Sequence, residues 1–218
     1  MKAMRKFIYF HFFKRFLDIV FSFLLLVVMF PLVLITGALV YSGLGWPILA
    51  KKRFTGQNEK PFTLYSFRTE KPDGSESSFG KGLISSGLHE LPVFVNIIRG
   101  DMSFIGPRPL PLEDTLFMNA EQKIRYAAKP GMTGWAQVNG GKNLSWEDTF
   151  TYDYHYIESL SFRMDISTLM MTLAAGFKQE SVSLDDSPRK RGLGEHLLEA
   201  GQIDQETYDK TLDKLNQV

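Results

Sequence analysis

The sequence predicts an α/β protein, a small domain of mixed helices and strands that one long apolar helix attaches to a membrane. Two observations support this fold class. Residues 19–50 contain no charged side chain, and residues 19–40 are almost wholly apolar. The chain beyond residue 46 alternates short strand-like segments with helical ones, separated by turns rich in Gly and Pro.

Composition sets limits on the function. The 218 residues carry a net charge of +1, so bulk charge predicts no nucleic-acid binding. The chain has no cysteine, which excludes disulfides and thiolate metal sites, and its four histidines form no helical pair for zinc. We expect three parts: a basic N-terminus and membrane helix (1–45), a globular domain (46–180), and a basic linker with a helical hairpin (181–218).

The apolar segment 19–40 admits three interpretations: a buried core helix, a signal peptide, or a membrane-embedded helix. An uncharged run of this length is unusual in a core, and the apolar part of a signal peptide is normally shorter. As a helix the segment would be roughly 33 Å long, enough to cross a bilayer. The basic residues before it, including Lys14 and Arg15, indicate a cytoplasmic N-terminus. We therefore predict a membrane-embedded helix.

Pro31 lies in the middle of this segment and removes a backbone donor, so the helix should break or kink near Phe30. A kinked helix can still span the bilayer. It can also turn back and leave both ends on one face, if the freed carbonyls find partners. Helix physics alone leaves both arrangements open.

Within the globular part, local patterns predict the following elements. Strands are expected at 61–67 and 135–138, a turn at 130–134, and helices at 89–99, 113–128, 146–157 and 161–177. The last helix has an apolar face that could lie on a bilayer surface. Past the basic linker 187–191, a helix at 192–200 and a second one capped by Asp204 should pair, and dock on the domain or on a partner.

His89 and Glu90 would then lie at a helix N-terminus, where backbone donors favour anions such as phosphate. The alternative is that Glu90 is a first-turn acid that only stabilises the helix dipole. Residues 106–109, Gly-Pro-Arg-Pro, should form a rigid loop that presents Arg108.

Several ordered motifs together resemble one family. They are Lys-Arg-Phe-Leu-Asp at 14–18, Phe-Arg-Thr at 67–69, Glu-Leu-Pro at 90–92, Asn-Ile-Ile-Arg-Gly-Asp-Met-Ser-Phe-Ile-Gly-Pro-Arg-Pro at 96–109, and Pro-Gly-Met-Thr-Gly-Trp-Ala-Gln-Val-Asn-Gly at 130–140. The chain resembles the monotopic polyprenol-phosphate phosphoglycosyl transferases, or bacterial sugar transferases, over roughly residues 12–178.

The resemblance implies a re-entrant membrane helix broken at Pro31, a small mixed α+β domain and amphipathic surface helices, at the cytoplasmic face of the bacterial inner membrane. Such enzymes transfer a sugar phosphate from a nucleotide sugar to undecaprenyl phosphate in surface-polysaccharide assembly. An Asp-Glu pair acts: the aspartate attacks phosphorus and the glutamate helps to hold Mg²⁺. A diphosphate needs such a cation, and a covalent intermediate suits a soluble donor and a lipid acceptor.

This sequence departs from the family pattern at the nucleophile, where His89 replaces the aspartate while Glu90 is kept as the magnesium ligand. Other positions that would meet phosphate differ too: Ser66, Ile84 and Gly141 stand where basic residues are expected, and Arg53 is one residue out of register. The cations expected to contact phosphate are Arg68, Arg108 and Lys142, the last as a displaced substitute.

Two functional hypotheses follow. The chain is an active transferase with His89 as nucleophile, since a histidine is a phosphorus nucleophile near neutral pH. Alternatively it is a non-catalytic scaffold or regulatory partner, pairing with itself or with an active relative, because losing several phosphate ligands weakens both binding and transition-state neutralisation. His89 would then be a helix residue without chemistry. An engineered substitution is a third interpretation, which the number of changes disfavours.

Overall fold

The computed structural model describes residues 12–75, 77–177 and 191–217. Its α-helices are α2 (Lys14–Leu44), α3 (Ser78–Ser85), α4 (Val93–Arg99), α5 (Leu112–Leu116), α6 (Trp135–Val138), α7 (Trp146–Glu158), α8 (Phe162–Phe177), α9 (Leu193–Glu199) and α10 (Gln205–Asp213). Its strands are β1 (Leu49–Thr55), β2 (Pro61–Phe67), β3 (Ser103–Ile105), β4 (Leu110–Pro111) and β5 (Gly131–Thr133). Short 3₁₀ helices are η2 (Gln57–Glu59), η3 (Leu88–Glu90), η4 (Gln122–Ala127), η5 (Gly141–Asn143) and η7 (Lys214–Gln217).

The strands form two small sheets. β1 pairs antiparallel with β2 along its whole length, from Leu49↔Phe67 to Thr55↔Pro61, and β4 adds a short third strand to β1. β3 and β5 form a separate parallel pair. The predicted strand at 61–67 is confirmed as β2. Its partner β1 was not predicted, because its run of Lys51, Lys52 and Arg53 hides the alternation of a strand.

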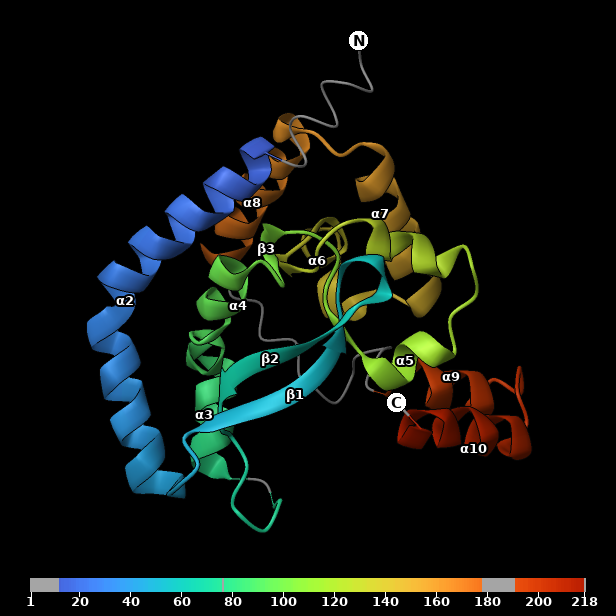
Figure 1. Ribbon diagram of the computed structural model, residues 1–218, viewed down its shortest axis with the longest axis horizontal. Coiled ribbons are helices and arrows are strands. Elements are labelled where there is room, and N and C mark those ends of the chain that lie inside the picture. The colour runs from blue at the N-terminus through green and yellow to red at the C-terminus, as the bar shows by residue number, and fades with distance from the viewer. Residues whose placement is uncertain (1–11, 76, 178–190, 218) are drawn as a thin grey trace.

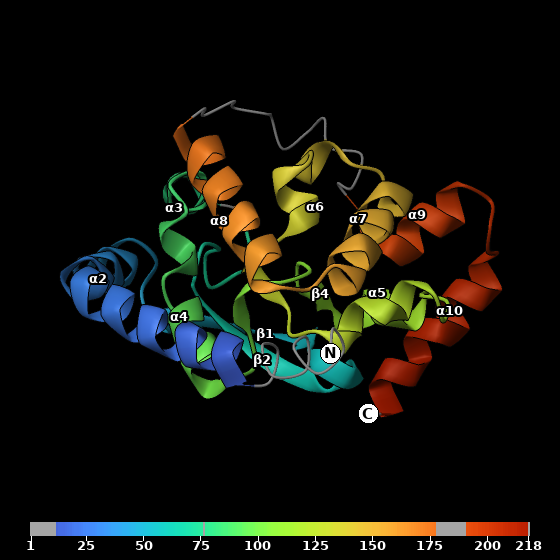
Figure 2. The same ribbon diagram turned by 90° about the horizontal axis from the view of Figure 1, so that it is seen from above.

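The helices are arranged around the β1–β2 hairpin. α6, α7 and α8 lie on one side of it, and α2 and the α9–α10 pair lie at opposite ends of the molecule (Figures 1 and 2). The largest core cluster joins the C-terminal half of α2 to α3, α4 and β2, with Val40 and Ile97 fully buried. Asn96 of α4 is also fully buried and ties this helix to β2, since it donates to Thr63 O (2.6 Å) and accepts from Tyr65 N (3.1 Å).

α2 is a single helix that continues through Pro31. The sequence predicted a break or a kink near Phe30. The helix does not break, and its ribbon bends near the middle of its length (Figure 1). Both ends contact the same domain: Asp18 accepts from Ser103 Oγ (3.0 Å) and Phe104 N (3.1 Å), while Val40 and Leu44 are buried in the main core. The helix, about 46 Å long at 1.5 Å per residue, therefore lies along the domain.

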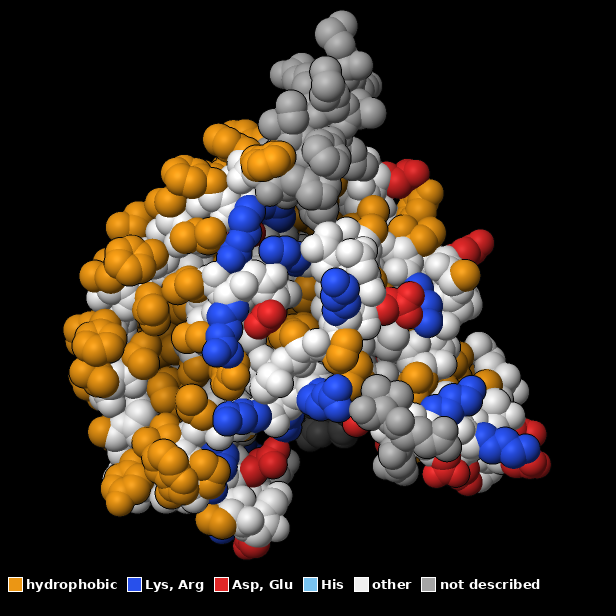
Figure 3. All heavy atoms as spheres, in the orientation of Figure 1, with side chains coloured by type: hydrophobic (Ala, Val, Ile, Leu, Met, Phe, Trp, Pro, Cys, Tyr) orange, Lys and Arg blue, Asp and Glu red, His pale blue; other side chains and the backbone are white. Residues whose placement is uncertain are grey.

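The outer surface of α2 is apolar and exposed. Among the described residues it is the one helix long and apolar enough to cross a membrane, and only 11% of its most apolar window is buried in the protein. That low burial argues against the interpretation as a core helix of a soluble protein. Figure 3 shows its apolar side chains as a continuous band along one edge of the molecule. α8 adds exposed Phe162, Met170 and Leu173.

Two segments around β5 differ from the sequence prediction. Residues 135–138, predicted as a strand, form the helical turn α6, and the predicted turn at 130–134 contains strand β5. The strand is displaced because residues 131–133 find a partner in β3, with Ser103↔Gly131 and Ile105↔Thr133 in register. A long-range partner therefore overrides the local pattern.

Two predicted helices are interrupted. The helix expected at 113–128 is split into α5 and η4, because Asn119 and Gln122 exchange backbone-to-side-chain hydrogen bonds of 2.9 Å and start a new turn. The helix expected from His89 to Arg99 consists of η3, a turn at Leu91–Pro92, and α4. The helices predicted at 146–157 and 161–177 are confirmed as α7 and α8.

The C-terminal helices dock on the domain of their own chain. Leu193 of α9 is 1% exposed and packs in a cluster with Leu110, Met118 and Trp146. Phe117 stacks on Tyr208 of α10 with ring centroids 5.3 Å apart. The predicted cap of the second helix is confirmed, since Asp204 accepts from Thr207 N at 2.8 Å. Most of the predicted basic linker, residues 187–190, lies outside the described residues.

The buried carboxyl group of Asp114 is expected to make the stability of the folded protein depend on pH. Its Oδ1 accepts from Leu193 N at 2.7 Å, and burial raises the pKa of its carboxyl group from 3.8 to about 6. The folded protein therefore holds a proton that the unfolded chain has released between about pH 4 and pH 6, so stability falls as pH rises through this range.

We expect Asp114→Asn, which keeps the oxygen acceptor, to remove this pH dependence and to stabilise the protein at pH 8 by up to roughly 3 kcal/mol. The measurement is the apparent Tm of the detergent-solubilised protein at pH 5 and pH 8. Asp213→Asn, at an exposed position of α10, is the control. An unchanged pH profile in Asp114→Asn would show that another group titrates.

Candidate functional site

A cavity of about 390 Å³ collects residues that are far apart in the sequence. Its walls come from β1, β2 and β5, from α3, η3, α4 and α6, and from the segments that follow β2 and precede β4. His89, Glu90, Arg68 and Arg108 all line it, so the structure brings four of the five predicted site residues together. The fifth, Lys142, belongs to η5, and its side chain lies outside the described part of the chain.

His89 is held in a defined orientation. It lies in η3, the turn that follows Gly87, whose φ of 71° is a left-handed conformation that favours glycine. Its Nδ1 is 3.3 Å from the carbonyl oxygen of Leu83, and its Nε2 is 3.8 Å from Glu90 Oε1. With the proton placed on Nδ1, the ring donates to Leu83 and the lone pair of Nε2 remains available beside Glu90.

The acidic residues of the cavity are Glu90 and Glu70. The side chain of Glu90 is 44% exposed, and Glu70 pairs with Lys52 at 3.5 Å. No group of three or more metal-ligating side chains occurs in the described residues. Mg²⁺ is commonly bound through one or two carboxylates together with substrate phosphates, and it seldom needs a site built from protein ligands alone. The carboxylate of Glu90 fits this mode of binding.

Arg68 lines the cavity but is buried, and its guanidinium donates hydrogen bonds to backbone carbonyls at the end of α2 and in the residues that follow it. It bonds to the carbonyl of Leu44, to Gly45 O at 2.8 Å and to Trp46 O at 3.4 Å. Arg68 therefore stabilises the C-terminal end of α2. Its Nε is buried without a hydrogen-bond partner.

Arg108 is exposed at the cavity, and its loop is fixed by backbone packing. A Cβ on Gly106 would lie 2.3 Å from Lys129 O, and one on Gly131 would lie 2.2 Å from Gly106 N, so only glycine permits this approach. The Arg108 carbonyl also accepts from Arg125 Nη2 at 2.6 Å. The predicted rigid loop is thus explained by two glycines and one buried arginine.

Sequence reasoning missed two polar residues of this cavity, Lys52 and Gln137. Ala50, Lys52 and Phe54 of β1 line the cavity, whereas Arg53 does not, because alternate residues of a strand point to opposite faces. Identifying β1 as a strand would have found Lys52. Gln137 has no such signal in the sequence, since it reaches the site from a helical turn that was predicted as a strand.

Two of the departures from the family pattern, Ser66 and Ile84, line the same cavity as His89. Ser66 belongs to β2 and Ile84 to α3. Ser66 precedes Ile84 by 18 residues, and Ile84 precedes His89 by 5, yet all three side chains line one cavity. The described cations at its wall are Lys52, Arg68 and Arg108.

The family model described as "Bacterial sugar transferase" matches residues 9–179, and the chain belongs to this family.

The similar proteins include both short and long relatives. The chain is 33% identical over 180 residues to the uncharacterized sugar transferase EpsL of Bacillus subtilis (strain 168), covering 78% of this chain and 89% of that protein. It is 30% identical over 190 residues to the UDP-glucose:undecaprenyl-phosphate glucose-1-phosphate transferase of Klebsiella pneumoniae, covering 78% of this chain and 41% of that protein. The exopolysaccharide production protein ExoY of Sinorhizobium fredii is 27% identical, covering 74% and 84%. This chain therefore spans less than half of the longer Klebsiella relative.

Proposed function

We propose that this protein acts in bacterial surface-polysaccharide assembly at the cytoplasmic face of the inner membrane, and that its cavity binds a nucleotide sugar. The observation that carries the proposal is the cavity in which His89, Glu90 and Arg108 meet. Family membership and relatives named for undecaprenyl-phosphate sugar transfer support the substrate classes, a nucleotide sugar and undecaprenyl phosphate.

The membrane helix is proposed to be re-entrant. Lys14 near one end of α2 pairs with Asp165 of α8 at 2.5 Å, and Leu44 at the other end is buried in the core and bonded by Arg68. Since both ends are attached to one domain, a spanning helix would draw that domain into the bilayer. A helix that enters one leaflet and returns keeps both ends on the cytoplasmic side and buries the apolar band.

The proposed chemistry uses Nε2 of His89. Nε2 attacks the phosphorus that carries the sugar, a P–N bond forms, and the P–O bond to the nucleoside monophosphate breaks with its electron pair leaving on that product. An oxygen of undecaprenyl phosphate then attacks the same phosphorus, and the P–N bond breaks. Mg²⁺ held by Glu90 would neutralise the diphosphate charge when bound, while Lys52 and Arg108 provide further positive charge.

A second candidate function is favoured by the character of the cavity wall. The guanidinium of Arg68 is occupied by backbone carbonyls, and Ser66 and Ile84 contribute no charge. A non-catalytic partner that pairs with itself or with an active transferase would retain the fold and the membrane contact while lacking transfer activity.

One assay tests the catalytic proposal. Full-length protein in detergent is incubated with Mg²⁺, undecaprenyl phosphate and a panel of nucleotide sugars, and release of nucleoside monophosphate is measured. We expect release with at least one donor. No release across the panel, while the Klebsiella relative is active in parallel, would reject the catalytic proposal.

A cellular experiment separates the two candidates. We expect deletion of the protein to lower surface-polysaccharide output and wild-type protein to restore it. Under the catalytic proposal a His89→Gln variant fails to restore output. Full restoration by that variant would instead establish the non-catalytic role.

A further inference from the structure

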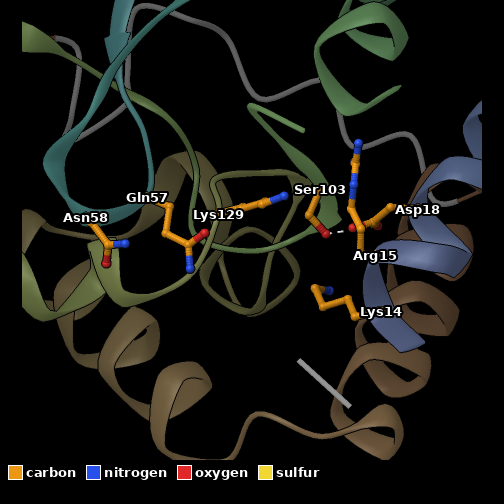
Figure 4. A pocket seen from close by; sticks show the side chains of 7 residues that line it. All are labelled: Lys14, Arg15, Asp18, Gln57, Asn58, Ser103 and Lys129. Atoms are coloured by element: carbon orange, nitrogen blue, oxygen red, sulfur yellow. Dashed lines mark hydrogen bonds between the residues drawn. The ribbon is translucent and has the colours of Figure 1, made fainter. Parts of the chain in front are cut away.

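A second polar cavity, of about 300 Å³, lies at the beginning of α2 and shares no lining residue with the His89 cavity. Figure 4 shows Lys14, Arg15 and Asp18 of α2 on one side of it, Gln57 and Asn58 of η2 on the other, and Lys129 reaching between them. Three of its lining residues are basic and one is acidic. The cavity therefore has the charge to receive an anion.

The basic groups differ in what already binds them. Arg15 donates to Ile97 O and Ile98 O, each at 2.5 Å, and Lys14 pairs with Asp165. Asp18 is satisfied by Ser103 and Phe104. The ammonium of Lys129, in contrast, has no hydrogen bond or ion pair within the described ranges, so it is the group most open to a ligand.

Lys129 and Arg15 are neighbours. A Cβ built on Gly100 would lie 3.1 Å from Arg15 Nη2 and 3.4 Å from Lys129 Nζ. Burial, followed by the charge of Arg15, lowers the pKa of Lys129, and the carboxylates of Asp18 and Asp101 offset part of this shift. A half-buried ammonium beside a guanidinium is electrostatically unfavourable, and an anion placed between them would relieve this cost.

An apolar cavity of about 190 Å³ adjoins the polar one, and Lys14 and Asp18 line both. It lies between α2 and α8, where Phe21, Ile166 and Leu169 form part of its wall. These side chains belong to the exposed apolar surface that faces the bilayer in the proposed membrane placement. The polar and apolar cavities thus meet at Lys14 and Asp18, an arrangement that suits a molecule with a charged head and an apolar chain.

We infer that the two cavities together bind an anionic phospholipid of the bilayer, with its phosphate beside Lys129 and Arg15 and one acyl chain between α2 and α8. A free phosphate would use only the polar half. A reacting acceptor phosphate would have to reach His89, which lines a different cavity. This site rests on the membrane placement proposed above and is independent of catalysis.

The test uses full-length protein in phosphatidylcholine vesicles that contain a small fraction of phosphatidylglycerol with a photoreactive acyl chain. We expect cross-links in peptides that contain Phe21 or Ile166. Lys129→Gln should lower their yield about fivefold, the effect of one lysine near an anionic surface. Lys123→Gln is the matched control, because Lys123 pairs with Glu59 and lines neither cavity.

Competition identifies the lipid. Unlabelled phosphatidylglycerol in excess should abolish the Lys129-dependent cross-links, whereas undecaprenyl phosphate and inorganic phosphate should not. Equal yields in Lys129→Gln and wild type, or competition by undecaprenyl phosphate alone, would overturn the inference. Vesicle flotation of the same samples separates the two proposals: protein that floats without these cross-links refutes only the lipid site, whereas protein that fails to float refutes the membrane placement and this site with it.

Discussion

Replacing His89 with glutamine is expected to lower nucleoside monophosphate release by at least about 10³-fold, because removal of a nucleophile eliminates the covalent step. Glutamine keeps the size and polarity of the side chain, so the cavity should persist. Glu90→Gln should also lower the rate, through loss of the proposed magnesium ligand, and excess Mg²⁺ should recover part of that loss. The measurement is initial rate at saturating donor.

His155→Gln is the matched control, since this histidine is exposed on α7 and does not line the cavity. A second readout tests the intermediate itself. Donor labelled at the sugar-linked phosphorus should leave label on the wild-type protein that is lost in acid and kept in base, as expected for a P–N bond. Undiminished activity in His89→Gln would show that another group attacks phosphorus.

Replacing Arg125 with methionine is expected to destabilise the protein by about 3–5 kcal/mol, because it removes the positive charge that is paired with the buried carboxylate of Asp153. Arg125 Nη2 lies 2.9 Å from Asp153 Oδ2, and both side chains are 2% exposed. The same guanidinium donates to the carbonyl of Arg108. The change therefore removes both an ion pair to α7 and an anchor of the loop that presents Arg108.

The measurement is equilibrium unfolding of the detergent-solubilised protein. The double variant Arg125→Met/Asp153→Leu should recover most of the loss, because no charge is then left buried. Lys210→Met removes an exposed pair with Glu206 on α10 and should change stability little. If Arg125→Met is as stable as that control, the buried pair does not contribute as its geometry predicts.

Much of the fold could be predicted from local patterns. The apolar helix, β2, α7, α8 and the Asp204 cap follow from hydrophobic periodicity and capping, which depend on neighbours in the sequence. The failures have two causes. Residues 131–133 form a strand where a turn was predicted, and residues 135–138 form a helical turn where a strand was predicted, because β5 pairs with the distant strand β3. The helix predicted at 113–128 divides because Asn119 and Gln122 form local capping hydrogen bonds.

The site was predicted in part for a different reason. His89, Glu90 and Arg108 were found because they stand within motifs that resemble a family, and the structure places them in one cavity. Lys52 was missed because its strand was missed. The hydrogen bonds from Arg68 to three backbone carbonyls have no sequence signal, since these acceptors lie more than 20 residues away, at the end of α2 and just after it.

The family, the long apolar helix and the presence of His89 before Glu90 can all be recognised from local sequence, because each depends on consecutive or regularly spaced residues. Three features become visible only once the chain is folded: Ser66, Ile84 and His89 share one cavity, both ends of α2 attach to one domain, and Lys129 lies near Arg15 beside an apolar cavity. Each of these features depends on side chains that are distant in the sequence and close in the folded protein. Packing and electrostatic interactions depend on the spatial separation of the groups, which local sequence patterns do not specify.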